Sequence, residues 1–142
     1  MKIHYLCLFV IISIIQYSCT ETELIDDLQF QKNLLSGTGS YNDIERTWKI
    51  DSITFNGEGL FLSNSQLNYT KTFSSSGKYV DSDGNSGLWE IPNINNLEIQ
   101  ILNTVTEKSL IYMILDINSI NLNLELVDQT NIYKYFFIRY DE

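Results

Sequence analysis

Few residues in this chain could act as acids, bases or nucleophiles. The only histidine, His4, lies in an apolar N-terminal stretch, so the rest of the chain cannot build a Ser-His-Asp triad or a histidine metal site. Paired carboxylates can hydrolyse glycosides, but strand alternation puts Glu98 and Glu125 on outward faces. The remaining candidates fall at strand ends or turns, as solvated carboxylates do: Asp81, Asp83, Asp116 and Asp128. We therefore expect no enzymatic activity and no cofactor.

The segment Asp81-x-Asp83-x-Asn85 has the oxygen-ligand spacing of a calcium loop. The full motif then requires glycine at position 86 and a bidentate glutamate at position 92, where this chain has Ser86 and Pro92. A tight hairpin turn explains the same residues. We expect a turn and no metal site.

Lys71 is the unusual residue of a predicted strand at 67–73. By alternation it shares an inward face with Tyr69 and Phe73. An inward ammonium could bind the anionic head group of a ligand whose apolar part is covered by aromatic residues, with Tyr69 and Trp89 as candidates. Alternatively, Lys71 lies at the open mouth of the sheet structure, with its stem packed and its ammonium in water.

The N-terminus has the features of an export signal. Met1-Lys2 supplies a positive charge, and residues 6–15 form an apolar stretch too short to span a bilayer as a helix. The following Gln16-Tyr17-Ser18-Cys19 resembles a bacterial lipobox, with Gln16 in place of the usual aliphatic residue. Removal of residues 1–18 would leave Cys19 as the only cysteine, which indicates lipid attachment there. A free thiol near an ordinary cleavage site is the alternative.

The charge of the chain excludes some partners. The full sequence has a formal net charge of −9, and loss of Lys2 would make it about −10. Nucleic acids and anionic lipid surfaces both require a basic protein surface. The acidic segment Thr20-Glu21-Thr22-Glu23 looks like an export signal to the outer face of the outer membrane. We expect a protein held by its lipid on the outer membrane, facing the periplasm or the cell surface.

Residues 19–43 are predicted to be a tether that contains a short amphipathic helix at 20–35. Thr20 and Glu23 have capping-box spacing, and Leu24, Leu28 and Leu35 share one face. This helix either plugs one end of the folded domain or belongs only to the tether. The segment 36–40 is a flexible linker, and the folded domain is expected at 44–142.

The folded domain reads as a series of short strands separated by tight turns. Two such turns, at 74–77 and 82–85, contain Gly77 and Gly84. A longer loop, expected to act as a lid, covers 60–65, and a bulge near Asp51-Ser52 would return Ile53 and Phe55 to the core. The strand at 110–117 is apolar on both faces, so we expect it to be central or covered. The strands are expected at 48–55, 67–73, 78–81, 88–91, 97–102, 110–117, 121–126 and 132–140. Eight sequential strands predict a small all-β, up-and-down antiparallel barrel, because closure removes exposed edges.

Single aromatic residues and glycines at turn spacing resemble the lipocalin-like domains of small bacterial lipoproteins. They are Thr72-Phe73-x-x-x-Gly77-x-Tyr79 and Gly87-x-Trp89-x-Ile91. The resemblance implies that Trp48 and Arg139 stack at the closed end of the barrel. Arg46-Thr47-Trp48 departs from the family pattern, which has Gly-x-Trp.

Two functions follow from these expectations. The barrel could bind a small apolar or amphiphilic ligand. Alternatively, its interior is filled and the protein is a non-catalytic accessory subunit that binds a protein partner through the outside of the barrel. Large inward residues such as Trp48, Tyr69 and Leu122 favour a filled or narrow interior.

Overall fold

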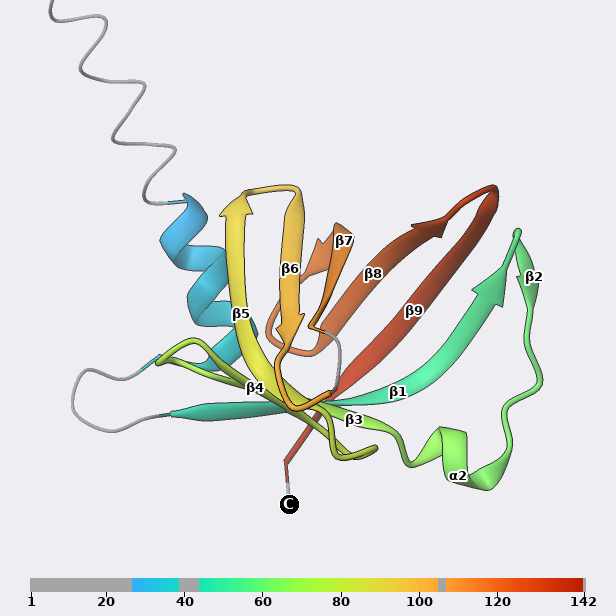
Figure 1. The fold of residues 1–142 in the computed structure, drawn as a ribbon, viewed down its shortest axis with the longest axis horizontal. Helices are drawn as coiled ribbons and strands as arrows, with labels where there is room; N and C mark the ends of the chain where they lie inside the picture. Colours follow the sequence, from blue (N-terminus) through green and yellow to red (C-terminus); the bar gives the residue numbers. More distant parts are fainter. Residues whose placement is uncertain (1–26, 39–43, 105–106, 142) are drawn as a thin grey trace, which may run out of the picture.

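A computed structural model describes residues 27–38, 44–104 and 107–141. Eight of its nine strands form a closed antiparallel barrel in the order β1-β3-β4-β5-β6-β7-β8-β9, in which β1 also pairs with β9 (Figure 1). The two-residue strand β2 pairs only with the end of β1. The predicted up-and-down barrel is therefore confirmed. The strands are β1 (Glu45–Phe55), β2 (Glu58–Gly59), β3 (Thr70–Ser74), β4 (Lys78–Asp81), β5 (Ser86–Asn93), β6 (Asn96–Ile101), β7 (Lys108–Ile117), β8 (Asn121–Asp128) and β9 (Asn131–Tyr140).

The barrel closes through β1 and β9, and a bulge lies within this pair. Ile50 pairs with Phe137 and Ser52 pairs with Phe136, so the register shifts between Ile50 and Ser52. The shift returns Ile53 to the face that Ile50 occupies, and Ile53 packs against the core. The predicted bulge near Asp51-Ser52 is thus confirmed.

The second predicted strand begins later than expected, because a short helix, α2 (Asn64–Leu67), precedes it. Ser63 caps this helix: its backbone N–H donates to Gln66 Oε1 at 2.9 Å, and its hydroxyl accepts from the Gln66 backbone N–H at 3.4 Å. The predicted loop at 60–65 therefore contains the first two residues of a one-turn helix, Asn64 and Ser65.

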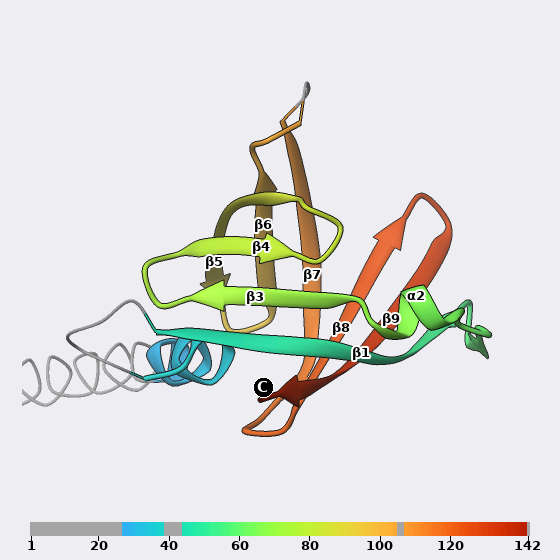
Figure 2. The ribbon, with the colours of Figure 1, turned by 90° about the horizontal axis from the view of Figure 1, so that it is seen from below.

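Residues 27–36 are helical and cover one end of the barrel. Leu35 is fully buried, and its carbonyl accepts a hydrogen bond from Trp48 Nε1 at 2.8 Å. Of the two roles expected for the N-terminal helix, its described part plugs the barrel. This helix and α2 lie toward opposite ends of β1 (Figures 1 and 2). The signal segment, Cys19, the predicted capping pair Thr20 and Glu23, and residues 39–43 of the tether lie outside the described residues.

Large side chains fill most of the barrel interior. The core comprises Leu35, Trp48, Ile50, Leu62, Phe73, Tyr79, Trp89, Ile91, Leu97, Ile99, Ile101, Tyr112, Leu122, Leu124 and Phe137. The outward face of β7 is uncovered in the described structure: Ile111, Met113 and Leu115 are 59%, 42% and 41% exposed. The predicted central position of this strand is confirmed, since β7 pairs with both β6 and β8, but its outward apolar face is not covered by the described residues.

Candidate ligand-binding site

Lys71 and Asp81 occupy opposite positions on β3 and β4. Both face the barrel interior, with exposed fractions of only 4% and 5%. The inward direction predicted for Lys71 is confirmed, whereas the alternative of an ammonium in bulk water is wrong. Ionic groups are rarely buried unless hydrogen bonds satisfy them, so their partners define the chemistry of this region.

Two tyrosine hydroxyls connect the lysine to the aspartate. Lys71 Nζ donates to Tyr69 Oη at 2.9 Å and to Tyr79 Oη at 2.7 Å. The two hydroxyls in turn donate to Asp81 Oδ2, at 3.0 Å and 2.8 Å. In the described structure, the hydrogen bonds that connect the Lys71 ammonium to the Asp81 carboxylate pass through these two hydroxyls. Such a linked network polarises each of its hydrogen bonds.

The turn between β4 and β5 fixes the Asp81 carboxylate. Its Oδ1 accepts from the backbone N–H groups of Asp83 and Asn85 at 3.1 Å and 3.0 Å. The side-chain amide of Asn85 donates to both carboxylate oxygens, at 3.1 Å and 3.0 Å. Asp81, Asp83 and Asn85 thus form a hairpin turn in which Asp81 accepts the hydrogen bonds, in keeping with the predicted turn.

Burial sets the protonation of these groups. Burial alone would raise the pKa of Asp81, but hydrogen bonds from Asn85, Tyr79 and Tyr69 leave it below its ordinary value. Burial lowers the pKa of Lys71 to about 8, although the charges of Asp81 and Asp83 oppose this shift. Burial raises the pKa of Tyr69 and Tyr79, so both hydroxyls keep their protons at physiological pH.

A cavity of about 340 Å³ lies beside this network, within the size range of small-molecule sites. Its buried wall includes Lys71 and Tyr112, and its exposed rim includes Ser65 and Gln66 of α2. The complete lining is Ile50, Ile53, Ser65, Gln66, Tyr69, Lys71, Asp83, Tyr112 and Tyr135. We call this the mouth cavity. Ser65 and Gln66 belong to α2, which lies toward the opposite end of β1 from the plugging helix (Figures 1 and 2).

The mouth cavity offers hydrogen-bond donors that the described protein does not use. Two of the three ammonium hydrogens of Lys71 have tyrosine acceptors, and the third has none among the described residues. The Tyr112 hydroxyl likewise makes no hydrogen bond within that part of the chain, and its oxygen is not sealed from solvent. Lys71 Nζ also lies 5.6 Å from the centroid of the Tyr112 ring, a favourable cation–π distance.

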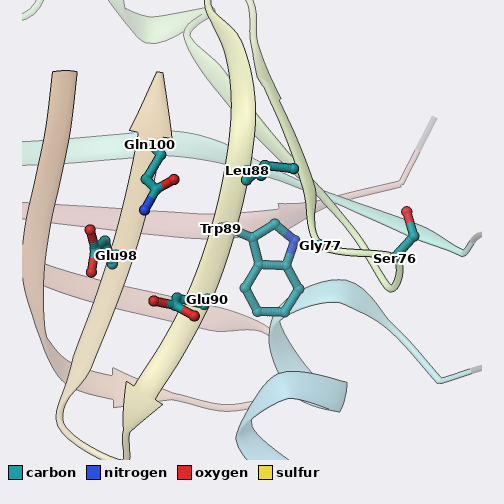
Figure 3. A pocket seen from close by; sticks show the side chains of 7 residues that line it. All are labelled: Ser76, Gly77, Leu88, Trp89, Glu90, Glu98 and Gln100. Carbon is teal, nitrogen blue, oxygen red and sulfur yellow. The ribbon is translucent and has the colours of Figure 1, made fainter. Parts of the chain in front are cut away.

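The structure does not bring Trp89 to the mouth cavity. Trp89 Nε1 donates to the Ser74 carbonyl at 2.9 Å. The indole packs edge-on to the Phe73 ring, with the ring centroids 5.9 Å apart. The indole instead lines a separate groove of about 270 Å³, together with Glu90 and Glu98 from the neighbouring strands β5 and β6 (Figure 3). Its predicted role beside Lys71 is corrected: its side chain is held by the end of β3.

The closed end also differs from the expectation. Trp48 and Arg139 are opposite each other in the β1–β9 register. The guanidinium over the Trp48 ring, however, belongs to Arg46, whose Cζ lies 5.9 Å from the ring centroid. Arg46 also donates to the Leu34 carbonyl of the plugging helix. Arg139 Nε instead pairs with Asp141 Oδ1 at 2.7 Å. The predicted stacking of Arg139 on Trp48 is corrected to a contact made by Arg46.

Sequence reasoning missed much of the cluster around Lys71. Tyr79 and Tyr112 were not singled out as site residues, and Asp81 was considered only as a solvated carboxylate or a calcium ligand. The available signal was hairpin register: the turn at 74–77 pairs Phe73 with Tyr79, which sets Lys71 opposite Asp81.

Within the described residues, no group of three or more His, Cys, Asp or Glu side chains is placed to hold a metal ion. No helix in the same part of the chain is both long enough and apolar enough to span a bilayer. The comparisons with family models, curated proteins and solved structures found no match to this chain.

Proposed function

We propose that this chain is an exported lipoprotein, anchored to the outer membrane through Cys19, whose barrel binds a small amphiphilic molecule in the mouth cavity. The observation that carries the binding function is the unused ammonium hydrogen of Lys71 at the wall of a cavity lined by apolar and aromatic groups. A polar acceptor on the ligand would meet Lys71 and Tyr112. Its apolar part would pack on Ile50, Ile53 and Tyr135.

The geometry favours a small ligand with a compact acceptor. Asp81 already balances the charge of Lys71, so an anion gains less here than at an isolated lysine. A carboxylate, a carbonyl or a hydroxyl could each accept the free hydrogen bond. The filled core below the cavity leaves no room for a long acyl chain to pass through the barrel.

Ligand-observed NMR with benzoate, benzamide, benzyl alcohol and octanoate tests the binding function. The Lys71→Met variant should lose about tenfold to a hundredfold in affinity for the best binder, as expected for a hydrogen bond to a charged group. Lys108→Met, on the exposed end of β7, is the matched control and should bind as the wild type does. Binding by none of the compounds, or equal binding by Lys71→Met, would overturn the proposal.

Lys71→Met should leave the fold intact, which makes the test interpretable. Asp81 would keep its hydrogen bonds from Tyr69, Tyr79, Asn85 and the Asp83 backbone. The methionine side chain retains most of the volume of the lysine stem.

A second function is favoured by the uncovered apolar face of β7, formed by Ile111, Met113 and Leu115. Exposed apolar patches often mark the site where another protein binds. This face therefore suits the binding of a protein partner, with this chain as an accessory subunit. Cross-linking in cells, comparing wild type with Met113→Glu, tests it. Val80→Glu, at an exposed position of β4, is the control. A cross-link pattern unchanged by Met113→Glu would remove this function.

A further inference from the structure

We propose that Lys71 captures small aldehydes by forming a reversible imine within the mouth cavity. This inference rests on the proposed binding function and names the chemical class of ligand that the cavity takes. It is a stoichiometric binding reaction of one side chain and requires no cofactor.

The geometry leaves one direction at Lys71 Nζ open to a molecule in the cavity. The hydroxyls of Tyr69 and Tyr79 occupy two hydrogen-bond directions, at 2.9 Å and 2.7 Å. In the neutral amine both of its hydrogens can serve these tyrosines, and the lone pair then takes the remaining direction. The two tyrosines therefore orient the amine as a nucleophile toward the cavity that Lys71 lines.

The surroundings of Lys71 also increase the fraction of its side chain that is a neutral amine. Burial lowers the pKa of Lys71 to about 8, and Asp81 and Asp83 are the charged groups that oppose this shift. Tyr69, Tyr79 and Tyr112 face the amine as neutral hydroxyls, because burial raises the pKa of each. At pH 8 about half of Lys71 is then neutral, against less than about one in a hundred for an ordinary lysine.

The reaction balances without an oxidant or reductant. The Lys71 nitrogen attacks the aldehyde carbon, a C–N bond forms, and the carbonyl oxygen takes a proton to give a carbinolamine. Loss of that oxygen as water, with a proton from the nitrogen, gives the imine. The Tyr112 hydroxyl is free to donate to the carbonyl oxygen during attack. The hydroxyls of Tyr69 and Tyr79 can pass protons to and from the nitrogen.

The lining restricts which aldehydes fit. Ile50, Ile53 and Tyr135 form an apolar wall, and the cavity of about 340 Å³ is small. We therefore expect short aliphatic or single-ring aromatic aldehydes to react. Sugars, which carry many hydroxyls and would leave them without partners against this wall, should not react.

Reductive trapping tests the proposal. The purified full-length chain is incubated with benzaldehyde and sodium cyanoborohydride at pH 8, and the modified lysines are located by peptide mass spectrometry. Lys71 should be modified at least about tenfold faster than the exposed Lys78 and Lys108. Its rate should fall as the pH is lowered from 8 to 6, and Tyr112→Phe should slow it. Modification of Lys71 no faster than of Lys78 and Lys108 would overturn the proposal.

Two comparisons separate this proposal from the binding function on which it rests. If benzyl alcohol binds in a manner that depends on Lys71 but benzaldehyde is not trapped there, the cavity binds ligands and the imine proposal fails. If benzaldehyde is not trapped and none of the four NMR probes binds, both proposals fail. Glucose under the same trapping conditions controls for general amine reactivity, and its selective attachment to Lys71 would contradict the stated ligand class.

Discussion

Lys71 and Asp81 lie opposite each other on β3 and β4, yet the hydroxyls of Tyr69 and Tyr79 stand between their charged groups. The arrangement places a cation at the wall of the mouth cavity while its counter-charge is held by the turn behind it. Burying two charges in this way is costly unless hydrogen bonds compensate for the lost contacts with water. The tyrosines therefore stabilise the fold as well as shape the site.

Tyr79→Phe should lower the free energy of unfolding by about 1–3 kcal/mol, because it removes one donor to Asp81 and one acceptor for Lys71. The phenyl ring should keep its packing against Phe73 at 5.4 Å. Urea denaturation measures the loss. Tyr140→Phe on β9, where the residue is 39% exposed, is the control and should change stability little. Equal stability of Tyr79→Phe and wild type would show that the network contributes nothing to folding.

The stability of the chain should rise between pH 8 and pH 10. Folded Lys71 has its pKa lowered to about 8 from an ordinary 10.5, so in this window the unfolded chain binds more protons than the folded one. The free energy of unfolding then increases with pH, by at most about 1.4 kcal/mol per pH unit. Urea midpoints measured from pH 6 to 11 should show the rise in wild type and not in Lys71→Met.

Above pH 10 the same curve should turn downward. The pKa values of Tyr69, Tyr79, Tyr112 and Tyr135 are all raised by burial, so the folded chain keeps protons that the unfolded chain loses near its ordinary value of 10.0. Stability therefore falls as pH rises further. This decline should persist in Lys71→Met, and a curve that kept rising to pH 11 would contradict the burial of the tyrosines.

Gly87→Ala should destabilise the barrel by about 2–3 kcal/mol through overpacking. Gly87 lies on β5, and an added Cβ would meet the Gln100 carbonyl oxygen of β6 at 1.7 Å, so the two strands would have to separate. Thermal unfolding measures the change. Gly59→Ala is the matched control, because nothing lies within 4 Å of a Cβ at that position of β2. Equal melting temperatures for the two variants would contradict the close approach of β5 and β6.

The sequence predicted the barrel well because alternation and turn residues act locally. The bulge at Asp51-Ser52 could be predicted since only a shift of one residue puts both Ile50 and Ile53 inside. The start of β3 was misplaced because the Ser63–Gln66 capping box, which begins α2, went unrecognised. A helix of one turn has no hydrophobic periodicity, so capping residues are the only local signal for it.

The candidate site was harder to predict, because it depends on contacts between distant strands. The inward direction of Lys71 followed from alternation within one strand. That Tyr112 of β7 lies over the same ammonium depends on the curvature of the whole barrel. Likewise, pairing along β1 and β9 placed Trp48 opposite Arg139, yet Asp141 holds Arg139 and leaves Arg46 over the indole. Register restricts which residues are near each other, and competing ion pairs decide which of them touch.

Cys19→Ser should release the protein from the membrane fraction, because the lipid attached to Cys19 is the proposed anchor and several buried acyl chains bind essentially irreversibly. Cell fractionation with a carbonate wash, followed by immunoblotting, measures the distribution. Cys7→Ser, within the segment expected to be removed, is the control and should stay in the membrane fraction. Retention of Cys19→Ser after the wash would rule out lipid anchoring at this residue.

A double-mutant cycle decides which arginine supports Trp48 at the closed end. Trp48→Ala should cost about 3–5 kcal/mol, since the indole is fully buried and its Nε1 bonds the plugging helix. Arg46→Ala should lose both its contact with the Trp48 ring and its hydrogen bond to Leu34, so its effect should be smaller when Trp48 is already absent. The effect of Arg139→Ala, which removes the partner of the exposed Asp141, should add independently to that of Trp48→Ala.

Urea denaturation of the three single and two double variants gives both coupling energies. Coupling to Arg139 and none to Arg46 would restore the stacking implied by the family resemblance and overturn the contact seen in the structure.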